Sequence, residues 1–408
     1  MTPRSKLPTQ SLMLRRRQAL VAPLAALLTG TLGSSLLTAC GGGGGDDAGA
    51  TGAQSFTTGP ISGLGSIIVG GVRFEDNSAR VEDDDGGSFA RSALKLGMMV
   101  EVLSSSIDDS AGRGVAALIR FGSEIKGPVA SVDATAQTFR MLDQTVVVRP
   151  ETVFDATLPG GFAAIAVGQI LEVHALLDSA TGQYIATRIE LEDSTSNYRL
   201  RGLLSQLDTA ARTFHIGDAV INYAGVPAGD LPSLTDGMRV RVRLQTTQVN
   251  GQWIATTVRT GVRRVDDLPD ARLRGYVTAF TSATQFEVNG IPVDASGARM
   301  DPPSATVALG TLVDVRGSAS GGTIVATRVK VIDRLSDEWR RVELHGAVSE
   351  LDTTSQTFLL RDVRVNYSNV VEWRDGVRAD LANGRSVEVK GLWSDDRSVL
   401  MAAVIEFE

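Results

Sequence analysis

The sequence predicts an all-β protein made of five tandem copies of one small five-stranded barrel of the OB type. Three observations carry this prediction: a β-hairpin pattern occurs five times, two glycines recur with it at a steady spacing, and no segment shows sustained helical periodicity. Any helices should therefore be short and confined to the links between the third and fourth strands.

The clearest hairpin is Phe286–Val293, in which apolar residues alternate on both sides of Asn289-Gly290. Asn-Gly favours a two-residue turn because both residues tolerate the positive φ angles that such a turn needs. Similar hairpins occur at Ile67–Phe74, Phe139–Val146, Phe214–Ile221 and Phe358–Val365. The hairpins are expected to supply the second and third strands of each copy.

Two series of glycines set the length of the repeat. One lies in the first strand, at Gly59, Gly127, Gly202, Gly275 and Gly346. The other precedes the fourth strand, at Gly97, Gly168, Gly237, Gly310 and Gly384. Both series advance by 68 to 75 residues per copy. The predicted copies span residues 58–122, 125–192, 198–265, 271–334 and 341–408.

The fourth and fifth strands complete each copy. The fourth alternates apolar and charged residues, as in Val313-Asp-Val315, which should place the charges in solvent. The fifth carries a recurring alanine, as in Ile185-Ala-Thr, suited to a strand that passes close to a neighbour. Five short strands with a longer third-to-fourth link fit a small barrel, whose closure removes edge strands. An SH3-like barrel or a small sandwich fits the same pattern.

The first 39 residues are predicted to be a lipoprotein signal peptide, with basic Arg15–Arg17 followed by the apolar run Ala19–Leu37. The segment Leu37-Thr-Ala-Cys40 resembles the bacterial lipobox, which implies that Cys40 is lipidated, for example with palmitate, and becomes the first residue of the mature chain. The arginine run also resembles a twin-arginine export signal, and the general export route fits as well.

Acylation with more than one chain gives stable membrane attachment. Gly41, in place of aspartate after the cysteine, implies by resemblance to lipoprotein sorting an outer-membrane location facing the periplasm; surface exposure is also compatible. Residues 40–57 are expected to form the acylated, glycine-rich tether.

The opening of the first copy, Gly59–Phe74, resembles a family of uncharacterised exported bacterial proteins built of tandem OB-like domains of unknown function. Their usual Asn-Gly turn is replaced here by Gly70-Gly71, whereas the fourth copy keeps it. The resemblance covers almost all of residues 59–408. It implies the fold and an exported compartment, and it carries no activity.

Composition excludes several classes of protein. The formal charge of −7 disfavours nucleic-acid binding. With Cys40 as the single cysteine, the chain has no intrachain disulfide and no site made of several thiolates. His174, His215 and His345 occupy non-equivalent repeat positions and are interpreted as solvated residues of strand faces. No catalytic residue, metal site or cofactor is predicted.

Two charged features are candidates for binding. Glu82–Asp85 is an acidic run that could hold Ca²⁺ but lacks EF-hand spacing, so a solvated loop is the preferred interpretation. Arg239, Arg241 and Arg243 alternate with valines and should project from one strand face, where guanidinium groups could bind an anionic glycan or lipid headgroup. A solvated face, or a contact with an acidic neighbouring copy, is the preferred interpretation of these arginines.

The sequence favours a non-enzymatic envelope lipoprotein that acts as a multivalent binding or spacer module. Its expected partners are the membrane, through the lipid anchor, and a glycan, peptidoglycan or envelope protein. The alternative is a cell-wall hydrolase whose site gathers histidines or carboxylates at a junction of two copies. A role in assembling a larger envelope machine is a third hypothesis. The sequence leaves the oligomeric state open.

Overall fold

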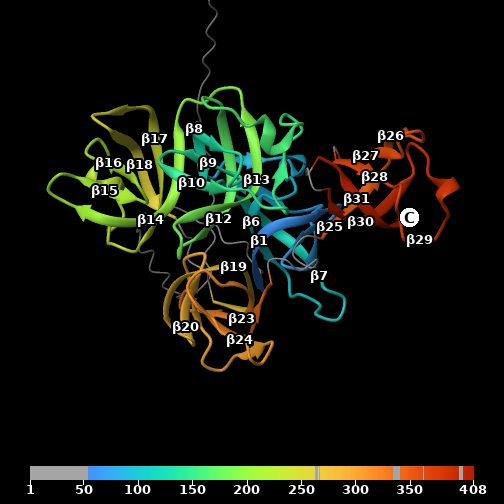
Figure 1. The fold of residues 1–408 in the computed structure, drawn as a ribbon. Helices are drawn as coiled ribbons and strands as arrows, with labels where there is room; N and C mark the ends of the chain where they lie inside the picture. The colour runs from blue at the N-terminus through green and yellow to red at the C-terminus, as the bar shows by residue number, and fades with distance from the viewer. Residues whose placement is uncertain (1–53, 262–264, 266, 334–340, 362, 395–397) are drawn as a thin grey trace, which may run out of the picture. The chain divides into compact units, whose positions relative to one another are not determined.

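A computed structural model of the chain describes residues 54–261, 265, 267–333, 341–361, 363–394 and 398–408. The signal peptide, Cys40 and most of the expected tether lie outside these residues. The five copies belong to the compact unit Ala48–Glu408, and Figure 1 labels many of their strands. The protein is all-β, as predicted, and each copy is a small five-stranded barrel.

The second copy shows how a barrel closes. Its five strands are β8 (Ile125–Asp133), β9 (Thr138–Met141), β10 (Gln144–Val147), β12 (Ile170–Asp178) and β13 (Gln183–Glu192). Antiparallel pairs join β8 to β9, β9 to β10, β12 to β13 and β12 to β8. A parallel pair between β10 and β13 closes the ring. The resulting order, first-second-third-fifth-fourth and back to first, is that of an OB-type barrel.

The other copies repeat these pairings. The first has β1 (Ser55–Leu64), β2 (Ile67–Val69), β3 (Val72–Glu75), β6 (Met99–Ser104) and β7 (Arg113–Phe121). The third has β14 (Tyr198–Asp208), β15 (Thr213–Ile216), β16 (Ala219–Asn222), β17 (Arg239–Val249) and β18 (Gln252–Thr260). The fourth has β19 (Leu268–Ser282), β20 (Gln285–Val288), β21 (Ile291–Asp294), β23 (Leu312–Ser320) and β24 (Thr323–Val331). The fifth has β25 (Val342–Ala347) continued by β26 (Ser349–Asp352), then β27 (Thr357–Leu360), β28 (Val363–Asn366), β30 (Ser386–Trp393) and β31 (Leu400–Phe407).

The links between the third and fourth strands hold additional short elements. In four copies a short strand runs parallel to the fifth strand: β4 (Arg80–Asp83), β11 (Val153–Phe154), β22 (Arg299–Asp301) and β29 (Glu372–Arg374). β5 (Ser88–Phe89) pairs with β4. The helices of the described residues are the 3-10 turns η1 (Arg91–Ala93), η2 (Gly161–Ala164), η3 (Ala228–Asp230) and η4 (Arg378–Asp380). They lie in these links, as predicted. No described helix has the length and apolar character that a membrane crossing requires.

The hairpin of the fourth copy forms at the predicted turn. Val288 faces Ile291 across it, and Asn289 and Gly290 have φ angles of 51° and 80°. In the second copy the corresponding turn residues, Leu142 and Asp143, also have positive φ angles, of 46° and 59°, although neither is glycine. The register of the hairpin therefore imposes this turn even where the local sequence does not favour it.

Glycine is required for a different structural reason in each of the two series, as the third copy illustrates. A Cβ atom on Gly202, in the first strand, would lie 2.5 Å from the Tyr184 hydroxyl. Gly237 has a φ angle of 85°, which favours glycine before the fourth strand. Its N–H donates to the Leu204 carbonyl at 2.8 Å, and the Leu204 N–H donates to Met238. The same two hydrogen bonds join the first strand to the start of the fourth in every copy.

The first strands also join different barrels. β8 pairs with β14 through Lys126 and Arg199, and β1 pairs in parallel with both β19 and β25. The second and third copies share one apolar core, as do the first and fifth. β1 begins at Ser55, three residues before the predicted start of the first copy at 58. The reason is that Phe56 packs into the core of the fourth copy.

Candidate functional site

Two strands of the third barrel carry a patch of five arginines. Arg199 and Arg201 on β14 lie opposite Arg243 and Arg241 on β17, and Arg239 continues the row. The intervening residues Leu200, Val240 and Val242 are fully buried in the barrel, so strand alternation turns the arginines to the outer face. We call these five residues the arginine face.

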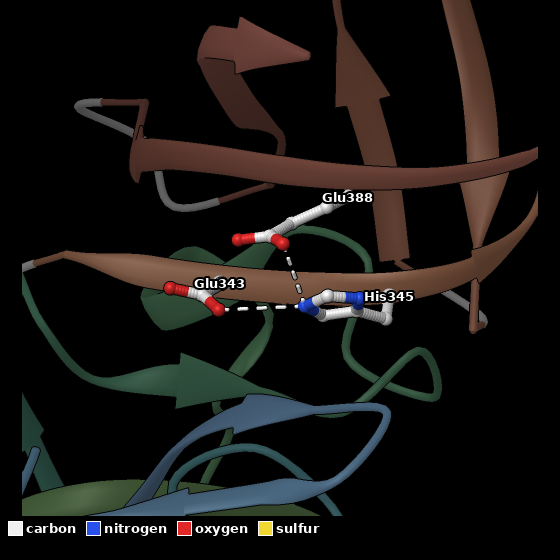
Figure 2. Close-up of side chains that lie close together, drawn as sticks. All are labelled: Glu343, His345 and Glu388. Carbon is white, nitrogen blue, oxygen red and sulfur yellow. Dashed lines mark hydrogen bonds and ion pairs between the residues drawn. The ribbon is translucent and has the colours of Figure 1, made fainter. Parts of the chain in front are cut away.

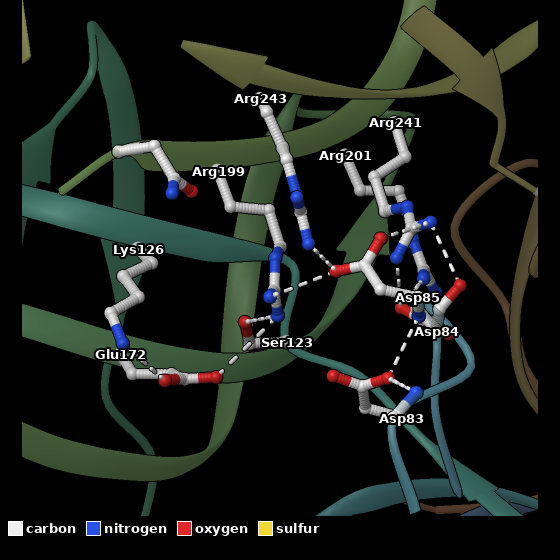
Figure 3. A network of polar contacts seen from close by, with 12 residues as sticks. Asp83, Asp84, Asp85, Ser123, Lys126, Glu172, Arg199, Arg201, Arg241 and Arg243 are labelled. Carbon is white, nitrogen blue, oxygen red and sulfur yellow. Dashed lines mark hydrogen bonds and ion pairs between the residues drawn. The ribbon is translucent and has the colours of Figure 1, made fainter. Parts of the chain in front are cut away.

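The acidic loop, Glu82–Asp85 of the first copy, lies against the arginine face (Figure 3). Arg241 reaches Asp85 at 2.9 Å and Asp84 at 3.4 Å. Arg201 pairs with Asp84, and Arg243 pairs with Asp85. The side chains of Asp84 and Asp85 are only 12% and 19% exposed. The prediction of a solvated acidic loop is therefore wrong, because four guanidinium groups, those of Arg199, Arg201, Arg241 and Arg243, attract the carboxylates of Asp84 and Asp85.

The acidic loop holds its own shape. The carboxylate of Asp83 accepts hydrogen bonds from the N–H groups of Asp85 at 3.0 Å and Gly87 at 2.7 Å. An aspartate that binds backbone N–H groups ahead of it stabilises a tight turn. This turn leaves the carboxylates of Asp84 and Asp85 directed at the arginines, as Figure 3 shows.

Glu124, immediately before β8 of the second copy, supplies a third acid to the arginine face. Its carboxylate lies 3.5 Å from Arg239 and 3.6 Å from Arg201, and it also accepts the N–H of Ala175 at 3.1 Å. Glu124 is 2% exposed and the side chain of Arg239 is 7% exposed. The arginine face thus meets three acids, two from the first copy and one from the residue that precedes β8.

Burial and charge act in opposite directions on the acid–base properties of this interface. Burial alone would raise the pKa of Asp85, but the hydrogen bond from Arg243 and the charges of Arg241, Arg243 and Arg199 lower it. Burial also lowers the pKa of Arg239 and Arg241, against the raising effect of their acidic neighbours. Each charge therefore depends on its partners, because a buried ion without them is costly.

A second ionic group continues from the arginine face through Arg199, which lies 3.7 Å from Glu172. Lys126 lies 3.1 Å from Glu172 and 2.9 Å from Glu192. Burial would raise the pKa of Glu172, but the cations Lys126 and Arg199, and His174 when protonated, lower it to about 2. His174 itself is 1% exposed, and burial lowers its pKa. The prediction of a solvated His174 is wrong, because this part of β12 packs against the first copy. The Met99 N–H lies 3.4 Å from His174 Nδ1.

A third polar cluster contains Glu343, His345 and Glu388, all from the fifth copy (Figure 2). His345 Nε2 lies 3.4 Å from Glu343 and 3.1 Å from Glu388, and the potential ligand atoms of the three lie within 4.8 Å of one another. Arg73 of the first copy contacts all three residues, and Lys390 lies 2.6 Å from Glu388. A metal ion would compete with these two cations, so we interpret the cluster as an ion-pair network.

The structure places the predicted arginines at an internal interface. Of the interpretations that the sequence left open for Arg239, Arg241 and Arg243, it shows the contact with an acidic neighbouring copy. An anionic ligand for them stays a prediction, and Cys40 lies outside the described residues. Sequence reasoning did not include Arg199, Arg201 or Glu124 in the site. The available signal was the pairing of first and fourth strands, which places residues 199 and 201 beside 243 and 241.

Comparison with known proteins identifies the repeat but no activity. The model of a domain of unknown function, DUF5666, matches residues 126–190, 274–330 and 345–406, so the chain contains repeated copies of this domain. No curated protein matches the chain. Among solved structures, drosophila Unr CSD456 is similar at 15% identity, covering 52% of this chain and 98% of that chain, with a TM-score of 0.14. A TM-score this low does not establish a shared fold. The barrel topology is instead defined by the strand pairings of this chain.

Proposed function

We propose that this protein is a non-enzymatic envelope lipoprotein, anchored through Cys40, whose barrels form a multivalent binding or spacer module. The observation that carries the proposal is the repetition of one closed barrel, with first strands and ion pairs joining one copy to another. A joined array presents related faces at fixed separations, and several weak contacts then add to a strong one.

The chemistry of the barrels supports a glycan or peptidoglycan ligand over a nucleic acid. OB-type barrels bind oligosaccharides and oligonucleotides on the face of their second and third strands. The formal charge of −7 disfavours binding of a nucleic acid, which is a polyanion. An envelope protein is the other partner that a tethered module of this kind could engage. The proposed location is the outer membrane, facing the periplasm.

The arginine face has a docking role in this proposal. Its charges meet Asp84, Asp85 and Glu124 of the same chain, so an external anion would have to displace these carboxylates. We infer that the arginine face holds the first and second copies against the third. Ligand contacts would then fall to barrel surfaces outside this interface.

The cavity beside the arginine face supports binding over hydrolysis. A cavity of about 50 Å³ is lined by the carboxylates of Asp84, Glu101 and Glu124 from two copies. Its volume has room for a few water molecules, and Arg201 and Arg239 line it too. A polymer-cleaving site needs a cleft for the chain and an acid that can give up a proton.

Two experiments test the proposal. Residues 48–408 contain the whole compact unit, and this soluble fragment should retain one or more glycans, sacculi or envelope proteins in array and pulldown assays. Metabolic labelling with a palmitate analogue should mark the full chain and not the Cys40→Ser variant. Recovery of no ligand would leave a passive spacer, and labelling of Cys40→Ser would contradict the anchor.

A further inference from the structure

A cavity of about 420 Å³ lies where the first, second and fifth copies meet, away from the arginine face. Its volume is within the range of small-molecule sites, roughly 300–1,000 Å³. Its walls include the buried apolar side chains Leu64, Leu96, Leu158 and Trp393. The copies that form it are joined at its edges, because β1 pairs with β25 and the Arg188 guanidinium donates to the Leu96 carbonyl at 3.2 Å.

The charged side chains of this cavity are mostly basic. Among its described lining residues are four cations, Lys95, Arg188, Arg361 and Arg364, and one anion, Asp155. Arg188 lies 2.5 Å from Asp155, so that carboxylate is already neutralised. Arg364 forms a surface ion pair with Glu350, whose side chain is 64% exposed, and the charge of Asp352 is also nearby. Such exposed pairs are weak, so Arg364 can turn to another anion at little cost.

Trp393 gives the cavity an unused hydrogen-bond donor. The residue is 9% exposed, lines the cavity, and has an indole Nε1–H with no acceptor among the described residues. A buried donor that lacks an acceptor is unfavourable. A ligand that carries a hydrogen-bond acceptor would relieve this cost. This observation is independent of the basic charges.

We propose that this cavity is a binding site for a small amphipathic organic anion, a carboxylate joined to an apolar body. The apolar walls bury the body of the ligand. The carboxylate pairs with Arg364 and Arg361 and accepts the Trp393 N–H. Guanidinium groups suit a carboxylate because both are planar and can form two parallel hydrogen bonds. The site goes beyond the proposed polymer-binding function, since it takes one small molecule in a cavity.

Calorimetric titration of the 48–408 fragment with decanoate tests the proposal, with decyltrimethylammonium as a probe of the same chain length and opposite charge. Decanoate should bind at one site per chain, and decyltrimethylammonium should bind at least tenfold more weakly. Arg364→Ala should weaken decanoate binding roughly tenfold. Arg374→Ala is the matched control, because Arg374 forms an equally exposed pair with Glu372 at 2.9 Å outside the cavity.

Trp393→Phe supplies a second test, because it removes the N–H and keeps most of the apolar bulk. It should weaken decanoate binding severalfold while binding of neutral decanol stays unchanged. Equal binding of the anionic and cationic probes, equal effects of Arg364→Ala and Arg374→Ala, or no decanoate binding at millimolar concentration would each overturn the proposal. None of these outcomes depends on whether the protein binds glycans.

Discussion

Arg241 of the third barrel lies 2.9 Å from the carboxylate of Asp85, which belongs to the acidic loop of the first. The two residues lie on copies separated by a whole barrel in sequence, and the side chain of Asp85 is 19% exposed. This contact explains why a chain of net negative charge concentrates arginines on one barrel. The face complements acids elsewhere in the same chain and holds copies together.

Asp84→Asn tests the energetic weight of this contact. The substitution leaves Arg201 and Arg241 with less compensating charge in a buried position, so the free energy of unfolding should fall by about 3 kcal/mol. Asp218→Asn is the matched control, because Asp218 is 73% exposed and pairs with Arg140 at 2.9 Å. The control should change stability by less than about 0.5 kcal/mol. Urea unfolding measures both, and equal effects would mean that the interface does not form in solution.

Glu172 should make the stability of the folded protein depend on pH. Its pKa in the folded protein is about 2, below the ordinary value of 4.5, so its contribution is present above pH 4.5 and is lost as the pH falls toward 2. The pKa of Glu192, which shares Lys126, is raised by burial and by Glu172, so its own contribution has the opposite sign. Glu172→Gln should lower the melting temperature at pH 7 and flatten its decline between pH 4.5 and 2.

Glu350→Gln is the control for this pH series, since Glu350 is 64% exposed and pairs only with Arg364 among the contacts described. Its melting curve should follow that of the unchanged protein across the whole series. A Glu172→Gln curve parallel to that of the unchanged protein between pH 4.5 and 2 would show that Glu172 is not held ionised by its neighbours.

The turn of the fourth hairpin should require glycine at position 290. Gly290 has a φ angle of 80°, where a Cβ atom strains the backbone, so Gly290→Ala should cost about 1–2 kcal/mol. Gly297 of the same copy has open space around it, and Gly297→Ala should be neutral or slightly stabilising. Thermal unfolding compares the two variants. Equal stability would contradict the assignment of the turn.

The glycine of the first strand should be needed for packing. A Cβ atom at Gly202 would meet the Tyr184 hydroxyl, which donates to the Arg201 carbonyl at 2.7 Å. Gly202→Ala should therefore cost about 1–3 kcal/mol through overpacking. Gly229→Ala, in the same copy and with nothing within 4 Å, provides the control. An unchanged unfolding midpoint for Gly202→Ala would place Tyr184 elsewhere in solution.

Local patterns predicted the barrel because its constraints are local. The turn at Asn289-Gly290, the positive φ of Gly237 and the valines of β17 each reflect a short-range need of the backbone. The interface between the acidic loop and the arginine face could not be predicted from local patterns. Asp84 and Arg201 come together only through the association of whole barrels, and no short-range pattern encodes that association. The prediction for His174 was wrong for the same reason, because Met99 and Gly122 of the first copy contact this buried side chain.

The non-enzymatic binding function is tested most directly by incubating the 48–408 fragment with purified cell-wall polymer, then separating the polymer by centrifugation. Two quantities are measured, the protein in the pellet and the sugar released into the supernatant. A non-enzymatic binding module should sediment with the polymer and release no soluble sugar. Sugar released above the level of the polymer alone, or protein that stays wholly in the supernatant, would contradict it.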